Sequence, residues 1–246
     1  MFLDVESTNK IVKLNISEKI KESWQKNLPS GMKYNSYKHV TDSMLAMRNR
    51  NKNPTLVVDQ DLRPISTHEG EYGWLCAGLP GGRLLYAREI SWRNRAVDIY
   101  QLPQHDRVTT LTRPGEPYRS LDISACCHPH SQWMAVVDSG YNGSRTLDIY
   151  DDKYQHQTHV DLGYTPYWIN SVAHVKDYII IIDYDSSSLH VYNWAGQEVC
   201  VWNTQQLGVG GDWIKGIGAA GQHRLVLAAG PKYDVMVTSL HLYDII

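Results

Sequence analysis

The residue types best suited to hold a metal ion gather in one short segment, Cys126-Cys127-His128-Pro129-His130. Thiolates and imidazoles are the ligands that zinc prefers. The alternating pattern that leads into the segment places both cysteines on a strand, where successive side chains point to opposite faces and cannot readily hold one ion together. We therefore predict that Cys126 and Cys127 pack in the interior, that no cofactor is bound, and that His128 and His130 lie in the following turn.

Two glycine-rich stretches, Pro80–Gly82 and Gly208–Asp212, could cradle a phosphate. Neither opens a helix after a strand and neither carries the lysine of a P-loop, so both are interpreted as turns. The sequence contains no Gly-x-Ser-x-Gly elbow and no His-Glu-x-x-His motif. The motif search therefore gives no support to an enzymatic function.

One strand pattern recurs along the chain, and the strands that it predicts would hold the side chains of any binding site in place. Alternating apolar and polar residues lead into Tyr100, Tyr150, Tyr192 and Tyr243, at steps of 50, 42 and 51 residues. Such alternation indicates a half-buried strand, and a repeat of this length indicates one supersecondary unit repeated in series. The tyrosines are predicted to occupy equivalent places on the fourth strand of each unit.

The signals around each copy predict four antiparallel strands joined by short turns. A single sheet of this kind cannot bury both of its faces, so the sheets must stack on one another, and radial stacking gives a β-propeller. We predict an all-β fold, one domain over residues 1–246, with about five complete four-stranded blades and a partial N-terminal blade: a six-bladed propeller, possibly incomplete. The predicted boundaries are 1–16 for the partial blade and 17–59, 60–101, 102–151, 152–194 and 195–246 for the blades.

Two segments resemble the NHL repeat, in which a buried strand ends in Asp-Ser or Asp-Gly before a short turn. They are His128-Pro-His-Ser-Gln-Trp-Met-Ala-Val-Val-Asp-Ser-Gly140, continuing through Arg145 to Asp151, and Leu3-Asp-Val-Glu-Ser-Thr-Asn-Lys-Ile-Val-Lys-Leu14. The resemblance implies an NHL-type propeller of the tripartite-motif kind. In that family, six-bladed domains often close a longer protein and bind protein or RNA.

Carboxylates recur at matching strand positions, as Asp98, Asp138, Asp148 and Asp183. Propeller lactonases and hydrolases place such groups around a central calcium, which makes a metal-dependent hydrolase the enzymatic alternative. The positions here fall in the outer half of each predicted sheet, where one ion needing six to eight oxygen ligands could not be reached. A structural role in every blade is the preferred interpretation.

The loops between the second and third strands, and those leading to the next blade, are expected to gather on one rim. The former contribute Lys38, His39, Arg83, His128, His130, His174, Lys176, Gln222 and His223, and the latter contribute His105, Arg107, Lys153, Tyr154 and Trp194. This predicted rim combines basic, histidine and aromatic side chains. An ordinary polar surface has a similar composition, so the set is a candidate binding rim only.

Composition narrows the function class. The net charge of −2 gives no field that would capture nucleic acid or an anionic membrane, and 16 Tyr and 8 Trp against a single Phe suit strands with one wet face. Four cysteines without Cys-x-x-Cys spacing and without a preceding signal peptide indicate a cytoplasmic protein. The incomplete first unit predicts either strands upstream of Met1 or closure by pairing residues 1–6 with 239–244.

The sequence therefore predicts a non-catalytic module that recognises a protein or peptide on the loop rim, as the partner-selecting end of a larger protein. RNA binding on the same rim is the second hypothesis, since Arg and Lys could hold phosphates while Tyr154 or Trp194 stacks a base. The metal-dependent hydrolase is the third. Neither DNA nor a membrane is expected as a partner.

Overall fold

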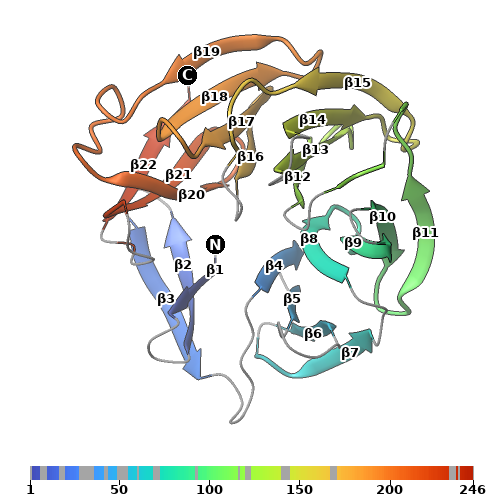
Figure 1. The fold of residues 1–246 in the computed structure, drawn as a ribbon. Coiled ribbons are helices and arrows are strands. Elements are labelled where there is room, and N and C mark those ends of the chain that lie inside the picture. Colours follow the sequence, from blue (N-terminus) through green and yellow to red (C-terminus); the bar gives the residue numbers. More distant parts are fainter. Residues whose placement is uncertain are drawn as a thin grey trace. The chain divides into compact units, whose positions relative to one another are not determined.

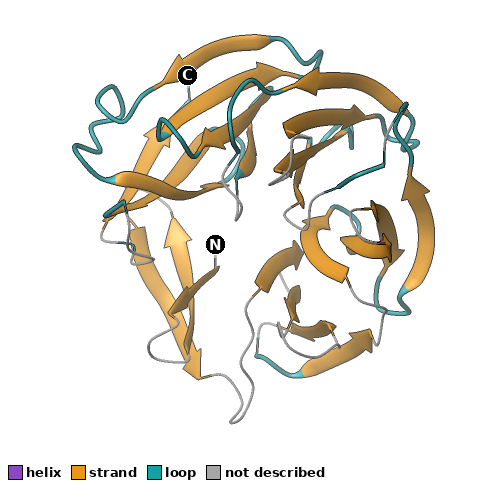
Figure 2. Ribbon diagram, in the orientation of Figure 1, coloured by secondary structure: helices purple, strands orange, loops and turns teal. Residues whose placement is uncertain are grey.

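In a computed structural model, the described part of the chain forms β-sheets (Figures 1 and 2). The described residues are 2–5, 10–16, 20–27, 36–41, 44–48, 55–59, 61–68, 73–91, 94–115, 117–119, 123–139, 145–166, 171–232, 237 and 239–245. Within these ranges the backbone forms strands, turns and isolated bridges, and none of it is helical. The all-β prediction is therefore confirmed for this part of the chain.

The chain divides into two compact units. Unit 1 comprises Met1–Glu89 and Val97–Thr110, and unit 2 comprises Ile90–Ala96 and Leu111–Ile246. Two sheets of unit 1 are formed by β1 (Phe2–Val5), β2 (Lys10–Ile16) and β3 (Ile20–Asn27), and by β4 (Ser36–Thr41), β5 (Met44–Arg48), β6 (Thr55–Asp59) and β7 (Pro64–His68). A further sheet, which has most of its residues in unit 1, is formed by β8 (Gly73–Leu79), β9 (Arg83–Ser91), β10 (Asn94–Gln101) and β11 (Asp106–Leu111).

Unit 2 holds three further sheets. They are formed by β12 (Ile123–Cys127), β13 (Met134–Ser139), β14 (Arg145–Tyr150) and β15 (His156–Asp161); by β16 (Val172–Val175), β17 (Tyr178–Asp183), β18 (Ser188–Asn193) and β19 (Glu198–Trp202); and by β20 (Trp213–Ala219), β21 (Arg224–Gly230) and β22 (Ser239–Asp244). In every sheet the strands are neighbours in chain order. Each sheet is therefore an antiparallel meander (Figure 1).

Successive sheets pack face to face inside each unit. In unit 1, β4 contacts β8, and apolar side chains from both sheets, including Val57 and Leu84, form one core. In unit 2, β16 contacts both β12 and β20, so the sheet β16–β19 has a core on each of its faces. The run Ile179–Ile182 is fully buried for this reason, with alternate residues facing the two cores.

The predicted blade pattern is wrong in number and in strand assignment. Among the described residues, four sheets have four strands, and the sheet β20–β22 has three. These make five three- or four-stranded blades. The predictions of five complete four-stranded blades and of a six-bladed propeller are therefore wrong. The N-terminal sheet also has three strands, not the predicted two, because Ile20–Asn27 pairs with Lys10–Ile16.

The error in strand assignment has a simple origin. Segments predicted as the first strand of a blade, such as β15 and β19, pair instead with β14 and β18 as the last strand of the preceding sheet. The segments of the sequence between these sheets, residues 112–122, 162–171 and 203–212, all contain Gly, and the first two also contain Pro. The repeated tyrosines still share one rank, but it is the third strand, since Tyr100, Tyr150, Tyr192 and Tyr243 lie on β10, β14, β18 and β22.

In the sheets β12–β15 and β16–β19 of unit 2, the third and fourth strands are joined by turns of the same kind. In the first, the Tyr154 N–H donates to the Asp151 carbonyl at 3.0 Å, and in the second, the Gly196 N–H donates to the Asn193 carbonyl at 3.0 Å. Tyr154 and Gly196 have φ of 63° and 79°, so the fourth turn residue is left-handed in both. The strand pairing beside each turn contains a β-bulge, at Ile149/Tyr150 in the first sheet and at Val191/Tyr192 in the second.

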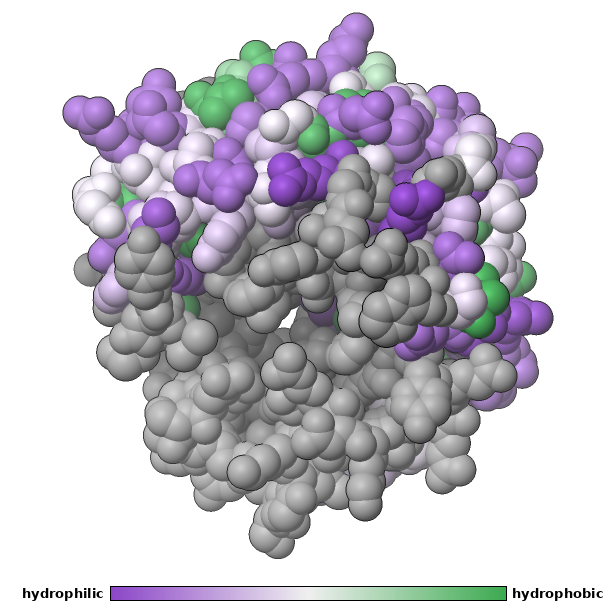
Figure 3. Space-filling model, in the orientation of Figure 1, coloured by the Kyte–Doolittle hydropathy of each residue, from purple (hydrophilic) through white to green (hydrophobic). Residues whose placement is uncertain are grey.

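Hydrophilic residues predominate on the described part of the face drawn in Figure 3, and hydrophobic residues are scattered singly. The exposed large hydrophobic side chains are also spread over several elements, as Ile65, Ile90, Val108, Tyr184, Val199, Val201 and Val237. A helix suited to crossing a lipid bilayer does not occur in the described part of the chain.

Candidate functional site

Four turns of unit 2 bring histidine and aromatic side chains together. His128 and His130 lie in the β12–β13 turn, His174 lies on β16 next to the β16–β17 turn, and Trp194 lies in the β18–β19 turn. Gln222 of the β20–β21 turn completes the group, because its Nε2 lies 3.1 Å from Nε2 of His130. We call these five residues the loop cluster.

The rings of the loop cluster touch one another. The His128 ring centroid lies 4.9 Å from that of His174, 5.5 Å from that of Trp194 and 5.9 Å from that of His130. The rings of His174 and Trp194 lie 5.8 Å apart. The backbone closes the same group, since the Lys176 N–H donates to the Gln222 carbonyl at 2.7 Å. Side chains far apart in the sequence therefore form one aromatic surface.

Local hydrogen bonds orient the His128 ring and set its tautomer. Its Nδ1 lies 3.2 Å from the backbone N–H of His130 and 3.1 Å from that of Ser131, so this nitrogen accepts and the ring proton of the neutral form is on Nε2. Nε2 lies 3.7 Å from a carboxylate oxygen of Asp177. The ring is thereby fixed in one orientation against the other members of the cluster.

His174 is held neutral. Burial disfavours the charged imidazolium and the neighbouring His128 repels it, which together lower the pKa of His174 to about 4, against the effect of a hydrogen bond to the backbone of Lys176. Two nitrogens of the cluster, Nε2 of His174 and Nε1 of Trp194, are buried and have no hydrogen-bond partner among the described residues. Buried polar atoms of this kind are uncommon and call for an explanation.

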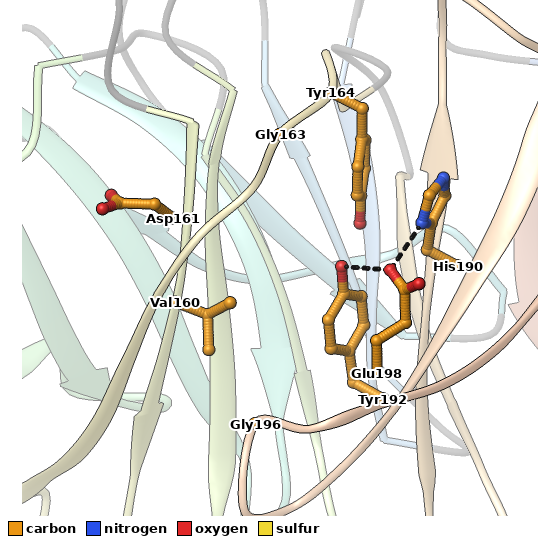
Figure 4. A pocket seen from close by; sticks show the side chains of 8 residues that line it. All are labelled: Val160, Asp161, Gly163, Tyr164, His190, Tyr192, Gly196 and Glu198. Atoms are coloured by element: carbon orange, nitrogen blue, oxygen red, sulfur yellow. Dashed lines mark hydrogen bonds and ion pairs between the residues drawn. The ribbon is translucent and has the colours of Figure 1, made fainter.

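A pocket of about 520 Å³ lies in the same unit (Figure 4). It is lined by Val160, Asp161, Gly163, Tyr164, His190, Tyr192, Gly196 and Glu198. Tyr164 stacks on His190 with ring centroids 3.8 Å apart and planes at 21°. The wall of the pocket is thus aromatic on one side and carries a carboxylate and an imidazole beside it.

Glu198 is the hydrogen-bonding centre of this pocket. Its Oε2 accepts from Nδ1 of His190 at 2.8 Å and from the Tyr192 hydroxyl at 3.0 Å, as the dashed lines in Figure 4 show. The bond from His190 holds the pKa of Glu198 below its usual value, and the bond from Tyr192 adds to this. Burial raises the pKa of Tyr192 to about 12 and that of Tyr164 well above its usual range.

The β18–β19 turn links the pocket to the loop cluster. Trp194 contributes its ring to the cluster, whereas Gly196 lines the pocket two residues later. A Cβ at Gly196 would lie 2.6 Å from Cγ2 of Thr158 and 2.9 Å from Cγ2 of Val160. This turn therefore lies directly against β15, and only glycine fits at its fourth position.

The other predicted rim residues lie elsewhere. Five belong to unit 1: Lys38 and His39 on β4, Arg83 at the start of β9, His105 in the β10–β11 turn, and Arg107 on β11. Lys38 is half-buried, and this burial lowers its pKa, while the side chain of His39 lies outside the described residues. Arg83 Nε donates to the Pro80 carbonyl at 2.8 Å, and His105 Nε2 lies 2.9 Å from the Ser66 hydroxyl.

In unit 2, Lys153 and Tyr154 lie in the β14–β15 turn and His223 is exposed in the β20–β21 turn. The structure therefore brings His128, His130, His174 and Trp194 into contact and keeps several other predicted residues apart from them. The rim as a whole stays a prediction.

The recurring carboxylates are tied to their own sheets. Asp98 is fully buried and accepts from Nε of Arg88 at 2.8 Å and from the Thr110 hydroxyl at 2.5 Å. Asp183 accepts from the backbone N–H of Asp185 at 2.9 Å in the β17–β18 turn. These contacts agree with the structural role expected for the repeated position.

Sequence reasoning missed the pocket residues Tyr164, His190 and Glu198. A signal was present, because His190 occupies the position two residues before the repeated tyrosine, where the two earlier copies of the strand have Asp98 and Asp148. A change from aspartate to histidine at a matching position indicates that its partner has changed as well. Here the partner is Glu198.

The comparisons with known proteins identify the fold. No protein-family model matches the sequence, and no curated protein matches it. Among the similar solved structures is a protein of unknown function from Bacteroides caccae, with 14% identity, a TM-score of 0.66, and coverage of 99% of this chain and 89% of that one.

A second similar structure is a catalytically inactive histidine-to-alanine variant of virginiamycin B lyase from Staphylococcus aureus, with quinupristin, at 12% identity, a TM-score of 0.60, and coverage of 93% of this chain and 73% of that one. A third is Hsv2 from Kluyveromyces lactis, at 10% identity, a TM-score of 0.55, and coverage of 97% and 68%. The fold is a β-propeller. No family match supports the NHL resemblance, which stays a prediction.

Proposed function

We propose that this propeller is a non-catalytic binding module and that unit 2 recognises a protein or peptide segment on the loop cluster. The observation that carries the proposal is the contact of three imidazoles and one indole, of which two lie in the β12–β13 turn, one at the end of β16 and one in the β18–β19 turn. Loops held by a rigid sheet scaffold are the usual place for binding residues, and aromatic side chains are enriched at protein interfaces.

The chemistry of the cluster suits a peptide. His174 is neutral down to about pH 4, so its Nε2 is a hydrogen-bond acceptor, and Nε1 of Trp194 is a donor. A peptide backbone offers a matching N–H and C=O. A small outward shift of the β18–β19 turn would let a bound segment satisfy both buried nitrogens and relieve their desolvation cost, about 1–3 kcal/mol for each such group.

The pocket extends the same surface. It begins at the turn that carries Trp194, and its carboxylates, Glu198 and the exposed Asp161, lie beside the Tyr164 ring. Carboxylates beside an aromatic face attract a cationic group. We expect a bound segment to place a lysine or arginine side chain in this pocket.

A displayed random peptide library, panned against the full chain, supplies the ligand for the test. Selected peptides are measured by fluorescence anisotropy against the wild type and against the double variant His128→Ala, His130→Ala. Removal of contact residues at the centre of an interface costs 1 kcal/mol or more, so we expect affinity to fall by about tenfold. Trp194→Phe, which keeps a ring and removes the N–H, should give a smaller loss.

Matched controls for these variants are His223→Ala, an exposed histidine that follows Gln222 in the β20–β21 turn and is not one of the loop-cluster residues, and Trp202→Phe on β19. Both should bind as the wild type does. Equal binding by the His128/His130 double variant would contradict the proposal. Binding of labelled single-stranded RNA that weakens steeply with salt, together with failure to select peptides, would favour RNA instead.

We also propose a cytoplasmic location. No disulfide joins the four cysteines, of which Cys76 is buried and the others are partly buried. Disulfides are rare in reducing compartments such as the cytoplasm, so cysteines without disulfides agree with this location. Measurement of the location of a tagged full chain by microscopy tests this.

A further inference from the structure

We propose that Asp148, His156 and His159 of unit 2 form a binding site for one divalent transition-metal ion, with Zn²⁺ the best match. Their candidate ligand atoms lie within 4.8 Å of one another. Oδ1 of Asp148 is 2.9 Å from Nε2 of His156 and 2.8 Å from Nδ1 of His159. This site is separate from the loop cluster and does not depend on the proposed function.

A β-bulge creates the arrangement. Residues three apart on a regular strand, such as His156 and His159, point to opposite faces. In the β14–β15 pairing, however, Tyr150 is opposite His156 and Ile149 is opposite Thr158, so Gln157 is an extra residue. The bulge turns the His156 side chain to the face of His159, which is itself opposite Asp148. Bulges commonly re-aim a side chain in this way near functional sites.

The distances suit metal capture after a small adjustment. Zinc takes nitrogen and carboxylate oxygen ligands at about 2.0–2.2 Å, which sets neighbouring ligand atoms of a tetrahedron about 3.3 Å apart. The present contacts are hydrogen bonds, with both imidazoles on one carboxylate oxygen. A shift of each ring proton to the other ring nitrogen, which in His159 faces Asp161, and a slight rotation of the rings would admit the ion. The His159 side chain is 41% exposed, so the ion can enter from solvent and water can take the fourth position.

The surrounding groups orient the ligands and balance the charge. Oδ2 of Asp148 accepts from Arg113 at 3.0 Å and from Thr146 at 3.2 Å, which leaves Oδ1 directed at the imidazoles. Nε2 of His159 lies 3.3 Å from a carboxylate oxygen of Asp161. A carboxylate on the far nitrogen of a ligating histidine is a common feature of zinc sites.

The local charge is negative. The Arg113 guanidinium lies between two buried carboxylates, because it also lies 3.7 Å from Asp138. With Asp161, three carboxylates and one guanidinium give a net charge of −2 around the two imidazoles. A divalent cation neutralises this charge, whereas a singly protonated imidazole would do so only in part.

The ligand types determine the class of ion. Calcium and magnesium prefer oxygen ligands alone, and two imidazoles with one carboxylate are typical of zinc and neighbouring transition metals. The site therefore differs from the central calcium of the hydrolase hypothesis, both in its ligands and in its place at the third and fourth strands of one sheet.

Calorimetric titration of the chelator-stripped full chain with zinc chloride tests the proposal. We expect one ion per chain, and with Co²⁺ as the probe we expect the intense visible absorption of a tetrahedral site. His159→Ala and His156→Gln should each weaken binding by more than about tenfold, and Asp161→Asn by about tenfold through the loss of its contact with His159. His159→Ala decides the outcome if His156→Gln does not fold, because His159 is the more exposed of the two.

His128→Ala and His130→Ala are the matched controls, since they remove histidines of the separate loop cluster. Both should bind zinc as the wild type does. The proposal is wrong if the wild type binds no zinc, if His159→Ala binds equally well, or if zinc binding is lost only in the loop-cluster variants.

Discussion

The sheets β12–β15 and β16–β19 share a backbone plan and differ in the residues placed on it. Both have a buried tyrosine on the third strand, a bulge opposite it, and the same turn to the fourth strand. In the first sheet a carboxylate on the third strand, Asp148, meets histidines on the fourth. In the second the types are exchanged, because His190 on the third strand meets Glu198 on the fourth.

This exchange moves the negative charge from the interior to the surface. The Asp148 side chain is fully buried, whereas that of Glu198 is 44% exposed. A buried charge must be compensated by fixed partners, while a solvated one costs little. The comparison shows that the backbone of the sheet sets where an acid–imidazole pair forms. Whether the carboxylate is buried or exposed depends on which of the two residues lies on the third strand.

The largest effect is expected from Asp148→Asn. The change leaves the Arg113 guanidinium, whose side chain is 5% exposed, without its closest carboxylate. Loss of one partner of a buried pair should lower the free energy of unfolding by about 3 kcal/mol. Urea denaturation of the full chain measures this. Glu198→Gln is the control and should cost less than about 1 kcal/mol, and similar losses for the two variants would remove the contrast between the sheets.

Gly196→Ala is expected to have the next largest effect. The new Cβ would lie 2.6 Å from Cγ2 of Thr158, in a residue with φ of 79°. Overpacking and left-handed strain together should lower the free energy of unfolding by about 1–3 kcal/mol. Thermal denaturation provides the measurement, and Gly208→Ala is a control, because it has φ of 65° but no atom within 4 Å of its Cβ position. An equal loss for the two would show that strain alone acts.

Tyr154→Gly tests the matching position in the other sheet. Tyr154 has φ of 63° in the same turn, so glycine removes left-handed strain but adds disorder to the unfolded chain. The two effects oppose each other, and we expect a gain of less than about 1 kcal/mol in the free energy of unfolding. Chemical denaturation measures it. A clear loss of stability would indicate that the half-buried tyrosine ring contributes more than its backbone strain costs.

The smallest effect is a dependence on pH. The pKa of Glu198 is lowered in the folded protein, so its contribution to stability is complete above the ordinary glutamate pKa of about 4.3 and is lost as pH falls through the lower, folded value. Denaturation of the wild type and of Glu198→Gln between neutral pH and pH 3 provides the measurement. The difference between them should shrink only below about pH 4.3. A difference that is constant over this range would mean that the carboxylate charge is not involved.

Much of the strand content could be predicted from the sequence, because alternation is local. The alternating patterns that lead into Tyr150, Tyr192 and Tyr243 correspond to the strands Arg145–Tyr150, Ser188–Asn193 and Ser239–Asp244. The sequence also placed His128, His174 and Trp194 on loops at one rim, and in the structure the His128 ring contacts the other two. The sequence did not show which turns join strands of one sheet and which connect two sheets. The alternating pattern of a strand is the same in both cases.

By itself, the sequence determined the all-β class, the repeated strand that carries the tyrosines and the positions of several turns, because these depend on hydrophobic period and turn residues over a few positions. Only the tertiary structure decided the sheet membership of each strand, the pocket at Glu198 and the meeting of His156 with His159. The spacing of those histidines predicts opposite faces. One extra residue, Gln157, reverses that prediction, and it is accommodated only because β15 pairs with a strand whose hydrogen bonds fix its register.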